Sequence, residues 1–356
     1  MQQELILNIY KVLGLGGITF FLGIVLTPIL THYLYKHKMW RKDVRTMAPD
    51  GAPTPIFSAL HKTRETKAPR MGGILIWGTT LIVALLFWVL PHIIPEPLFS
   101  KLNFLSRSQT WVPLGIMLGG AMVGLLDDLM LVFGKGGYKG GGLTFTRRVA
   151  LITIIAALGA YWFYAKLGMS EVFIPTIGAV DIGWLFVPFF IVVMLAVFST
   201  GVIDGIDGVS GGVFASIFAA YAGIAFFQNQ INLAAFTSVI VGAILAFLWF
   251  NIPPARFYMS ETGIMALTTT LTVVAFLTDA VFVLPIIAFP LVIDSLSVII
   301  QLGSKRFFKR KVFLVAPIHH HFEALGWPPE KVTMRFWVIS VVFAVVGMIL
   351  HLVSHF

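Results

Sequence analysis

Long apolar stretches alternate with short polar segments along the whole chain. Stretches of roughly 20 apolar residues recur through the 356 residues, and a helix of about 20 residues crosses the ~30 Å hydrocarbon core of a bilayer. Backbone groups inside hydrocarbon must bond to one another, so each stretch is predicted to be an α-helix. The predicted fold class is therefore an all-α polytopic integral membrane protein with about ten transmembrane helices. The expected spans are 12–34, 72–94, 111–133, 147–168, 182–203, 209–227, 233–252, 263–279, 281–303 and 333–354.

The composition excludes a soluble globular domain. The chain is 58% hydrophobic with a mean hydropathy of +0.91, which is more apolar surface than a soluble fold can bury. Only 12% of the residues are charged, so each acidic residue near a span is a candidate for function. The absence of cysteine excludes disulfides and thiolate chemistry.

The basic residues set the expected orientation. Most of the 25 Lys and Arg residues fall in alternate loops, and loops rich in Lys and Arg stay on the cytoplasmic side. Both termini are therefore expected to be extracytoplasmic. The net charge of +9 follows mainly from this topology, and no nucleic-acid partner is expected. The five loops expected on the cytoplasmic side, as the active-site face of a single domain of residues 1–356, are 36–71, 134–146, 204–208, 253–262 and 304–332.

Acidic and imidazole groups gather on this same side of the predicted bundle. Two adjacent carboxylates repel one another and are costly beside hydrocarbon unless a cation pairs with them. A divalent metal ion that holds phosphate is the natural candidate. The groups concerned are Asp127 and Asp128 at the end of a span, Asp204 and Asp207 in Asp-Gly-Ile-Asp-Gly, Glu261 before a span, and His319, His320 and His321 in the last loop.

Each of these motifs also has a purely structural explanation. The Asp pair can be a solvated helix end, the Asp-Gly-Ile-Asp-Gly segment and Glu261 can cap helices, and loop histidines can be solvated. The glycine-rich run 135–142 can wrap a phosphate or act as a plain linker. Asp294 lies well inside a predicted span, where it can hydrogen-bond to a neighbouring helix or belong to the site; the first is favoured.

The chain resembles the phospho-N-acetylmuramoyl-pentapeptide transferase family, a branch of the polyprenyl-phosphate N-acetylhexosamine-1-phosphate transferases. The triple histidine separates this branch from its relatives. The motifs that carry the resemblance are Ala316-Pro-Ile-His-His-His-Phe-Glu323, Gly326-Trp-Pro328, Arg335-Phe-Trp337, Met71-Gly72-Gly73, Asp127-Asp128, Asp204-Gly-Ile-Asp207-Gly and Phe250-Asn251.

The resemblance implies an enzyme of the bacterial inner membrane that uses Mg²⁺. Undecaprenyl phosphate and UDP-MurNAc-pentapeptide would be its substrates, and UMP and a lipid-linked peptidoglycan intermediate, lipid I, its products. Membrane lipids are expected partners, and a homodimer is implied by the resemblance alone.

The resemblance also implies roles for individual residues. Catalytic roles fall to Asp127, Asp128, Asp207 and His319. Substrate binding falls to Asp204, Asn251, Tyr258, His320, His321 and Lys139. Metal binding falls to Asp128 and Glu261.

The chain departs from the family pattern at several motif positions. Glu261 stands in place of a metal-binding Asp, Ser260 in place of a glycine, and Arg70 in place of a Thr. Gly201 and Leu131 replace an Asn and a Lys. These departures leave open a transferase of the same chemistry that acts on another UDP-N-acetylhexosamine for a different envelope polymer. A transporter is the third hypothesis, although its acids would be expected near the midplane of the bilayer.

Overall fold

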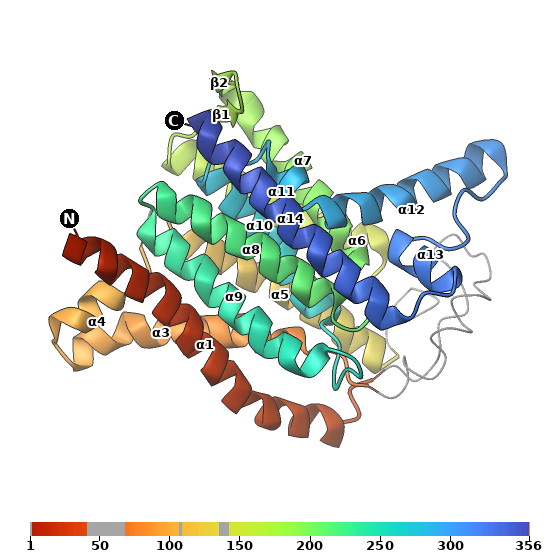
Figure 1. Ribbon diagram of the computed structural model, residues 1–356, viewed down its shortest axis with the longest axis horizontal. Coiled ribbons are helices and arrows are strands. Elements are labelled where there is room, and N and C mark those ends of the chain that lie inside the picture. Colours follow the sequence, from red (N-terminus) through yellow and green to blue (C-terminus); the bar gives the residue numbers. More distant parts are fainter. Residues whose placement is uncertain (1, 41–67, 107–108, 135–141, 356) are drawn as a thin grey trace.

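The computed structural model describes residues 2–40, 68–106, 109–134 and 142–355, which form a bundle of helices (Figure 1). Within these residues, nine helices are long and apolar enough to cross a membrane. The described strands are the two of an antiparallel hairpin, β1 Glu171–Ile174 and β2 Gly178–Asp181. The predicted all-α polytopic fold is confirmed.

Nine of the ten expected spans are found in the structure, and the expected span 281–303 is divided. It forms a short helix, α11 Leu284–Ile287, and a longer one, α12 Phe289–Phe308. Ala288 leaves the helical conformation between them, and the missing N–H of Pro290 is tolerated because it falls in the first turn of α12. In Figure 1, α12 runs away from the other long helices toward the side where α13 lies.

Helix α10, Ser260–Leu277, is the innermost helix of the bundle. Every residue from Thr262 to Phe276 is buried, and α5, Trp111–Val132, lies along it. A Cβ built at Gly120 or Gly124 of α5 would meet the backbone of α10, so these glycines allow the two helices to approach closely. This contact places the C-terminal end of α5 beside the first turn of α10.

The outer helices present apolar side chains to the exterior, as expected for helices in contact with lipid.

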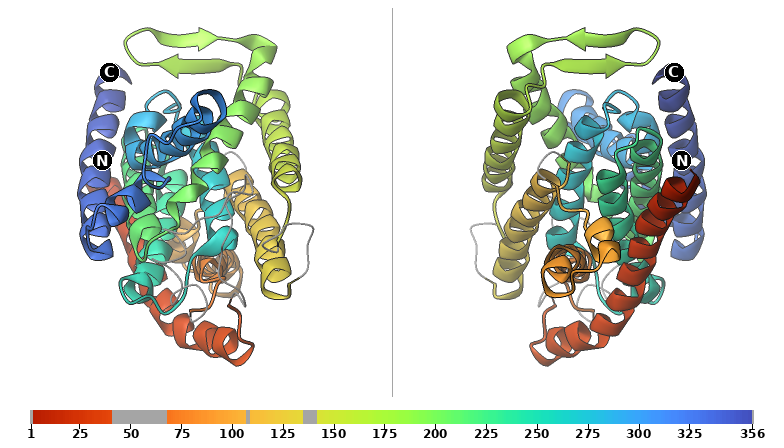
Figure 2. Two further views of the ribbon diagram at one scale, coloured as in Figure 1. Left: turned by 90° about the vertical axis from the view of Figure 1, so that its right-hand side faces the viewer. Right: turned by 90° about the vertical axis from the view of Figure 1, so that its left-hand side faces the viewer.

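Figures 1 and 2 show both chain ends on the side of the bundle away from α13. In chain order, the remaining elements are α1 Gln2–Lys36, α3 Gly73–Ile93, α4 Pro97–Leu102, α6 Phe145–Tyr161, the π-helix Trp162–Lys166, the 3-10 helix Gly183–Leu185, α7 Phe186–Ser199, the 3-10 helix Thr200–Ile203, α8 Val209–Phe227, α9 Ile231–Asn251, α13 Ile318–Ala324 and α14 Pro329–His355.

Candidate active site

The two adjacent aspartates are buried at the C-terminal end of α5, with 1% and 0% of Asp127 and Asp128 exposed. Arg148 Nη2 lies 3.0 Å from Asp127 Oδ2, and Arg70 Nε lies 3.1 Å from Asp128 Oδ1. Arg148 Nη1 also lies 2.8 Å from Glu261 Oε1. The cation that the sequence demands beside the pair is therefore supplied, in this structure, by two guanidinium groups.

The first turn of α10 joins the Asp pair to the Asp-Gly-Ile-Asp-Gly segment. The Thr262 N–H donates to Asp128 Oδ2 at 3.0 Å, and the Ser260 N–H donates to Asp204 Oδ2 at 2.9 Å. These are N–H groups that a helix start leaves without an internal acceptor, and its partial positive charge favours carboxylates there. Burial raises the pKa of Asp204, while hydrogen bonds from the Ser210 hydroxyl and the Ser260 N–H oppose that rise.

Ser260 has a φ of 60°, in the left-handed region that glycine adopts without steric cost. Ser260, which the resemblance marks as a departure from glycine, therefore lies at a strained backbone position next to Glu261, the metal-binding candidate. Strain of this kind persists only where the surrounding structure holds it.

Asp207 and Asn251 hold the Asp-Gly-Ile-Asp-Gly segment in place. The Ala255 N–H donates to Asp207 Oδ2 at 3.1 Å. The Asn251 side chain accepts from the Gly208 N–H at 3.0 Å and donates to the Phe257 carbonyl at 2.8 Å. Both ends of the Asn251 amide are thus engaged within the protein, between this segment and the 253–259 turn.

The triple histidine begins a short helix, α13 Ile318–Ala324, which corrects the expectation of a loop. His319 Nδ1 lies 2.9 and 3.0 Å from the two carboxylate oxygens of Asp294, and His320 Nδ1 lies 2.6 Å from Glu323 Oε2. His321 turns another way, where its Nδ1 accepts from the Leu314 N–H at 3.2 Å. Two of the three imidazoles are therefore fixed by carboxylates.

Gly205 brings these two imidazoles against the Asp-Gly-Ile-Asp-Gly segment. A Cβ built at Gly205 would overlap Nε2 of His319 and Nε2 of His320. His319 is fully buried, and its Nε2 has no hydrogen-bond partner among the described residues. A carboxylate has no proton to donate, so Nδ1 of His319 donates to Asp294, and Nε2 is the ring atom without a partner, buried against Gly205.

The structure thus places most of the predicted site residues in one continuous set of contacts. This set runs from Asp127 and Asp128 through the start of α10 to Asp204, and from Gly205 to His319 and His320. Tyr258 lies in the adjoining turn, where its carbonyl accepts from the Gly72 N–H at 2.7 Å. Lys139 lies outside the described residues.

Sequence reasoning missed two residues of this set, Arg70 and Arg148, and weighed Asp294 as either a helix-to-helix contact or a site residue, with the first favoured. Arg148 was counted only as a basic residue at a span end, and Arg70 only as a departure from a motif. Asp294 does hydrogen-bond to a neighbouring element, as favoured, but that partner is His319, so Asp294 belongs to the site. An acid deep in a span was the available signal, because such a group needs a specific partner.

The carboxylates expected to hold Mg²⁺ are paired with arginines in this structure. Asp127, Asp128 and Glu261 offer the carboxylate oxygens that Mg²⁺ prefers, and Arg148 contacts both Asp127 and Glu261, so these two carboxylates lie close enough to share one cation. Among the described residues, no group of three or more His, Cys, Asp or Glu side chains could hold a metal. Mg²⁺ commonly uses only one or two carboxylates together with substrate phosphates, so this arrangement is compatible with it.

Comparison with known proteins agrees with this geometry. The family model described as "Glycosyl transferase family 4" matches residues 110–279, which include the Asp pair, the Asp-Gly-Ile-Asp-Gly segment and α10. The fold, the site and this match define a membrane-embedded glycosyl transferase.

Similar curated proteins narrow the class. Phospho-N-acetylmuramoyl-pentapeptide-transferases of Chloroflexus aggregans and Anoxybacillus flavithermus are 31% and 33% identical, and these matches cover 99% and 96% of this chain. They cover 93% and 98% of the two relatives. The enzyme of that name from Geobacillus kaustophilus is 34% identical, with 93% of this chain and 95% of the relative covered. The chain belongs to the phospho-N-acetylmuramoyl-pentapeptide transferase family.

Proposed function

We propose that this protein transfers phospho-MurNAc-pentapeptide from UDP-MurNAc-pentapeptide to undecaprenyl phosphate. An oxygen of the lipid phosphate attacks the β-phosphorus of the nucleotide sugar. The bond from that phosphorus to the oxygen bridging to UMP breaks, and UMP leaves with the bonding electrons. The products are lipid I and UMP. The observation that carries the proposal is the single set of contacts that joins Asp128, the start of α10, Asp204, Gly205 and His319.

The place of the site supports this reaction. Asp127 and Asp128 stand at the end of one span, and Ser260 and Glu261 at the start of another. A water-soluble nucleotide sugar and a phosphate on a lipid tail can meet only where water touches the bilayer. The distribution of Lys and Arg supports the cytoplasmic face of the bacterial inner membrane as this place.

Each part of the site then has a chemical task. Asp127 and Asp128 engage the lipid phosphate, and Arg70 and Arg148 provide guanidinium groups that pair well with phosphate oxygens. A phosphate with a second pKa near 6 is largely dianionic at pH 7, so no strong base is required. Asp128 and Glu261 would hold Mg²⁺, which would neutralise charge on the diphosphate as it passes to UMP.

The remaining residues bind the nucleotide sugar. Asp204 and Asp207 lie toward the uridine and the diphosphate, and His319 presents Nε2 to a diphosphate oxygen. His320, which packs against Gly205 beside His319, shapes the diphosphate site. Tyr258 would meet the nucleoside, with its ring able to stack on uracil. Asn251, whose amide is engaged at both ends within the protein, would support the nucleoside site by holding the 253–259 turn.

Transfer from another UDP-N-acetylhexosamine is the second candidate. It is favoured by Glu261 and by Ser260 with its φ of 60°, since both lie where the metal and the phosphates would be held. Mg²⁺ demands near-ideal octahedral geometry, so a longer carboxylate on a strained turn can alter which substrate is held correctly.

The test is UMP release by purified protein with undecaprenyl phosphate and Mg²⁺. UDP-MurNAc-pentapeptide and UDP-GlcNAc are supplied in separate reactions. UMP is expected from the first reaction and not from the second, and a chelator is expected to stop it. If UMP forms with UDP-GlcNAc and not with UDP-MurNAc-pentapeptide, the second candidate function is correct. If UMP forms with neither substrate, both enzyme hypotheses are refuted.

A further inference from the structure

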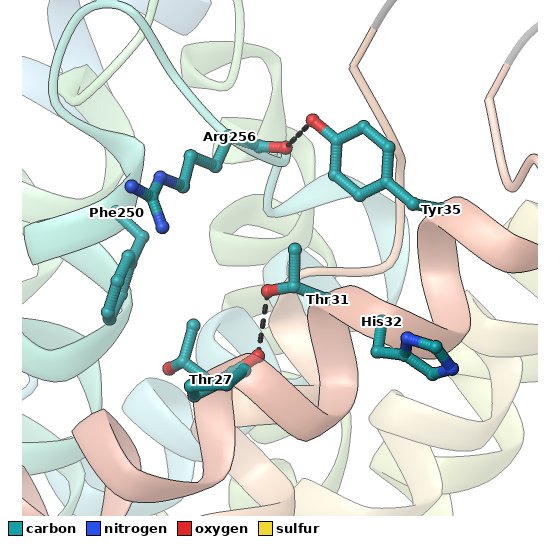
Figure 3. A pocket seen from close by; sticks show the side chains of 7 residues that line it. Thr27, Thr31, His32, Tyr35, Phe250 and Arg256 are labelled. Atoms are coloured by element: carbon teal, nitrogen blue, oxygen red, sulfur yellow. Dashed lines mark hydrogen bonds between the residues drawn. The ribbon is translucent and has the colours of Figure 1, made fainter.

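A separate pocket lies between α1 and the segment that follows α9, at the ends of both helices (Figure 3). Its volume is about 280 Å³, and its lining residues include Thr27, Thr31, His32, Tyr35, Phe250 and Arg256. Pockets for whole drug-sized ligands measure ~300–1,000 Å³. This pocket therefore suits a small polar headgroup rather than an entire lipid.

The pocket is suited to an anion. The Arg256 guanidinium lies over the Phe250 ring, 5.5 Å from its centroid. His32 also lines the pocket, but its ring points away from Arg256 in Figure 3. Among the described residues that line the pocket, none is acidic. The Thr31 hydroxyl already donates to the Thr27 carbonyl at 2.7 Å, so the Arg256 guanidinium is the main group left to recognise an anion.

The backbone of Arg256 is fixed on both sides. Its N–H donates to the Phe250 carbonyl at 2.9 Å, and its carbonyl accepts from the Tyr35 hydroxyl at 3.0 Å, as Figure 3 shows. Tyr35 thus ties α1 to the turn that carries the guanidinium. A cation on a fixed backbone loses less freedom when it binds a ligand.

Exposed apolar side chains occur on the same two helices, within about two turns of the residues that line the pocket. Val25 and Ile29 of α1 are 66% and 55% exposed, and Leu245 and Trp249 of α9 are 41% and 65% exposed. Such a surface faces acyl chains in a membrane, and Trp is favoured at the membrane–water interface. A phospholipid headgroup in the pocket would have its chains on this apolar surface, an advantage that a soluble phosphate lacks.

We infer that this pocket binds the headgroup of an anionic phospholipid, such as phosphatidylglycerol. Basic pockets between transmembrane helices are a recurrent way of holding such headgroups. The turn that carries Arg256 also reaches the candidate active site, because the neighbouring Ala255 N–H donates to Asp207 at 3.1 Å. A bound lipid would steady this turn and, through it, the Asp-Gly-Ile-Asp-Gly segment.

The test is native mass spectrometry of the purified full-length protein in detergent with added phosphatidylglycerol or phosphatidylcholine. No nucleotide is present, so the result does not depend on the proposed reaction. Wild-type protein is expected to retain phosphatidylglycerol in preference to phosphatidylcholine. Arg256→Gln is expected to weaken retention of phosphatidylglycerol about fivefold, because one basic residue near an anionic membrane surface contributes about 1 kcal/mol of binding free energy. Arg256→Lys keeps the charge and is expected to restore most of the retention.

Arg306→Gln is the matched control, because Arg306 is also exposed and also lies over a phenylalanine ring, 5.9 Å from the Phe307 centroid. It is expected to retain phosphatidylglycerol as wild-type does. Equal loss in both variants, or equal retention of the two lipids by wild-type protein, would overturn the assignment. Displacement of phosphatidylglycerol by glycerol 3-phosphate would identify a soluble phosphate as the occupant and would also overturn it.

Discussion

Replacing Asp128 with asparagine is expected to lower the rate of UMP release by at least about a hundredfold, the scale of losing one electrostatic contact to a reacting group. Asparagine keeps the shape of the side chain, and its carbonyl oxygen can still accept from the Thr262 N–H. It removes the charge that Arg70 contacts at 3.1 Å and that is proposed to help hold Mg²⁺.

The variant is expected to remain folded. The Arg70 side chain is 24% exposed, so its charge keeps some solvent when its partner is neutralised. Asp181→Asn is the control, because Asp181 is exposed on the hairpin and accepts from the Gly183 N–H at 2.9 Å. Initial rates and thermal unfolding in detergent should be measured on both variants. A wild-type rate in folded Asp128→Asn protein would remove Asp128 from the mechanism.

Replacing Asp294 with asparagine is expected to lower kcat about a hundredfold with a much smaller effect on KM, because general acid–base and orienting groups contribute on this scale. Asn can donate its amide N–H to Nδ1 of His319, which would move the ring proton to Nε2 and change what that atom offers to the diphosphate. Asp294 acts through His319 and is therefore a positioning residue.

The pH profile of kcat and the ¹⁵N NMR signals of the histidine rings distinguish positioning from simple structural support. The Asp294→Asn variant should show a changed profile and a changed His319 tautomer, and Asp294→Glu should recover part of the rate. Ser297→Ala is the control, because the buried Ser297 hydroxyl donates at 2.6 Å to the backbone carbonyl of Asp294 in the same helix. A lower rate in Asp294→Asn with the pH profile and tautomer of wild type would reduce Asp294 to a packing role.

Much of the fold could be predicted because a bilayer imposes a simple length rule on apolar segments. That rule could not find the break at Ala288, where the apolar run continues and only the backbone direction changes. It also could not show that His319 to His321 begin a helix, because a polar segment of seven residues carries almost no periodicity.

The acidic residues of the candidate site were picked out from the sequence, whereas their arginine partners were not. Carboxylates beside transmembrane helices are easy to identify as candidates, because a charged group near hydrocarbon is costly unless a partner or a function retains it. The partners of these acids lie far along the chain: Arg148 is 113 residues from Glu261, and Arg70 is 58 residues from Asp128. A basic residue at a span end is already explained by topology, so the sequence offered no reason to pair it. The pairs become visible only when the start of α6 and the segment before α3 are seen packed against α5 and α10.

The most direct test of the account is a structure of the protein with UDP-MurNAc-pentapeptide and Mn²⁺ in place of Mg²⁺. Anomalous scattering would locate the metal independently of any model of the nucleotide. The account predicts a metal bound by Asp128 and Glu261, and a diphosphate oxygen within hydrogen-bonding distance of Nε2 of His319. A nucleotide bound away from the Asp-Gly-Ile-Asp-Gly segment, or a metal that touches neither carboxylate, would contradict it.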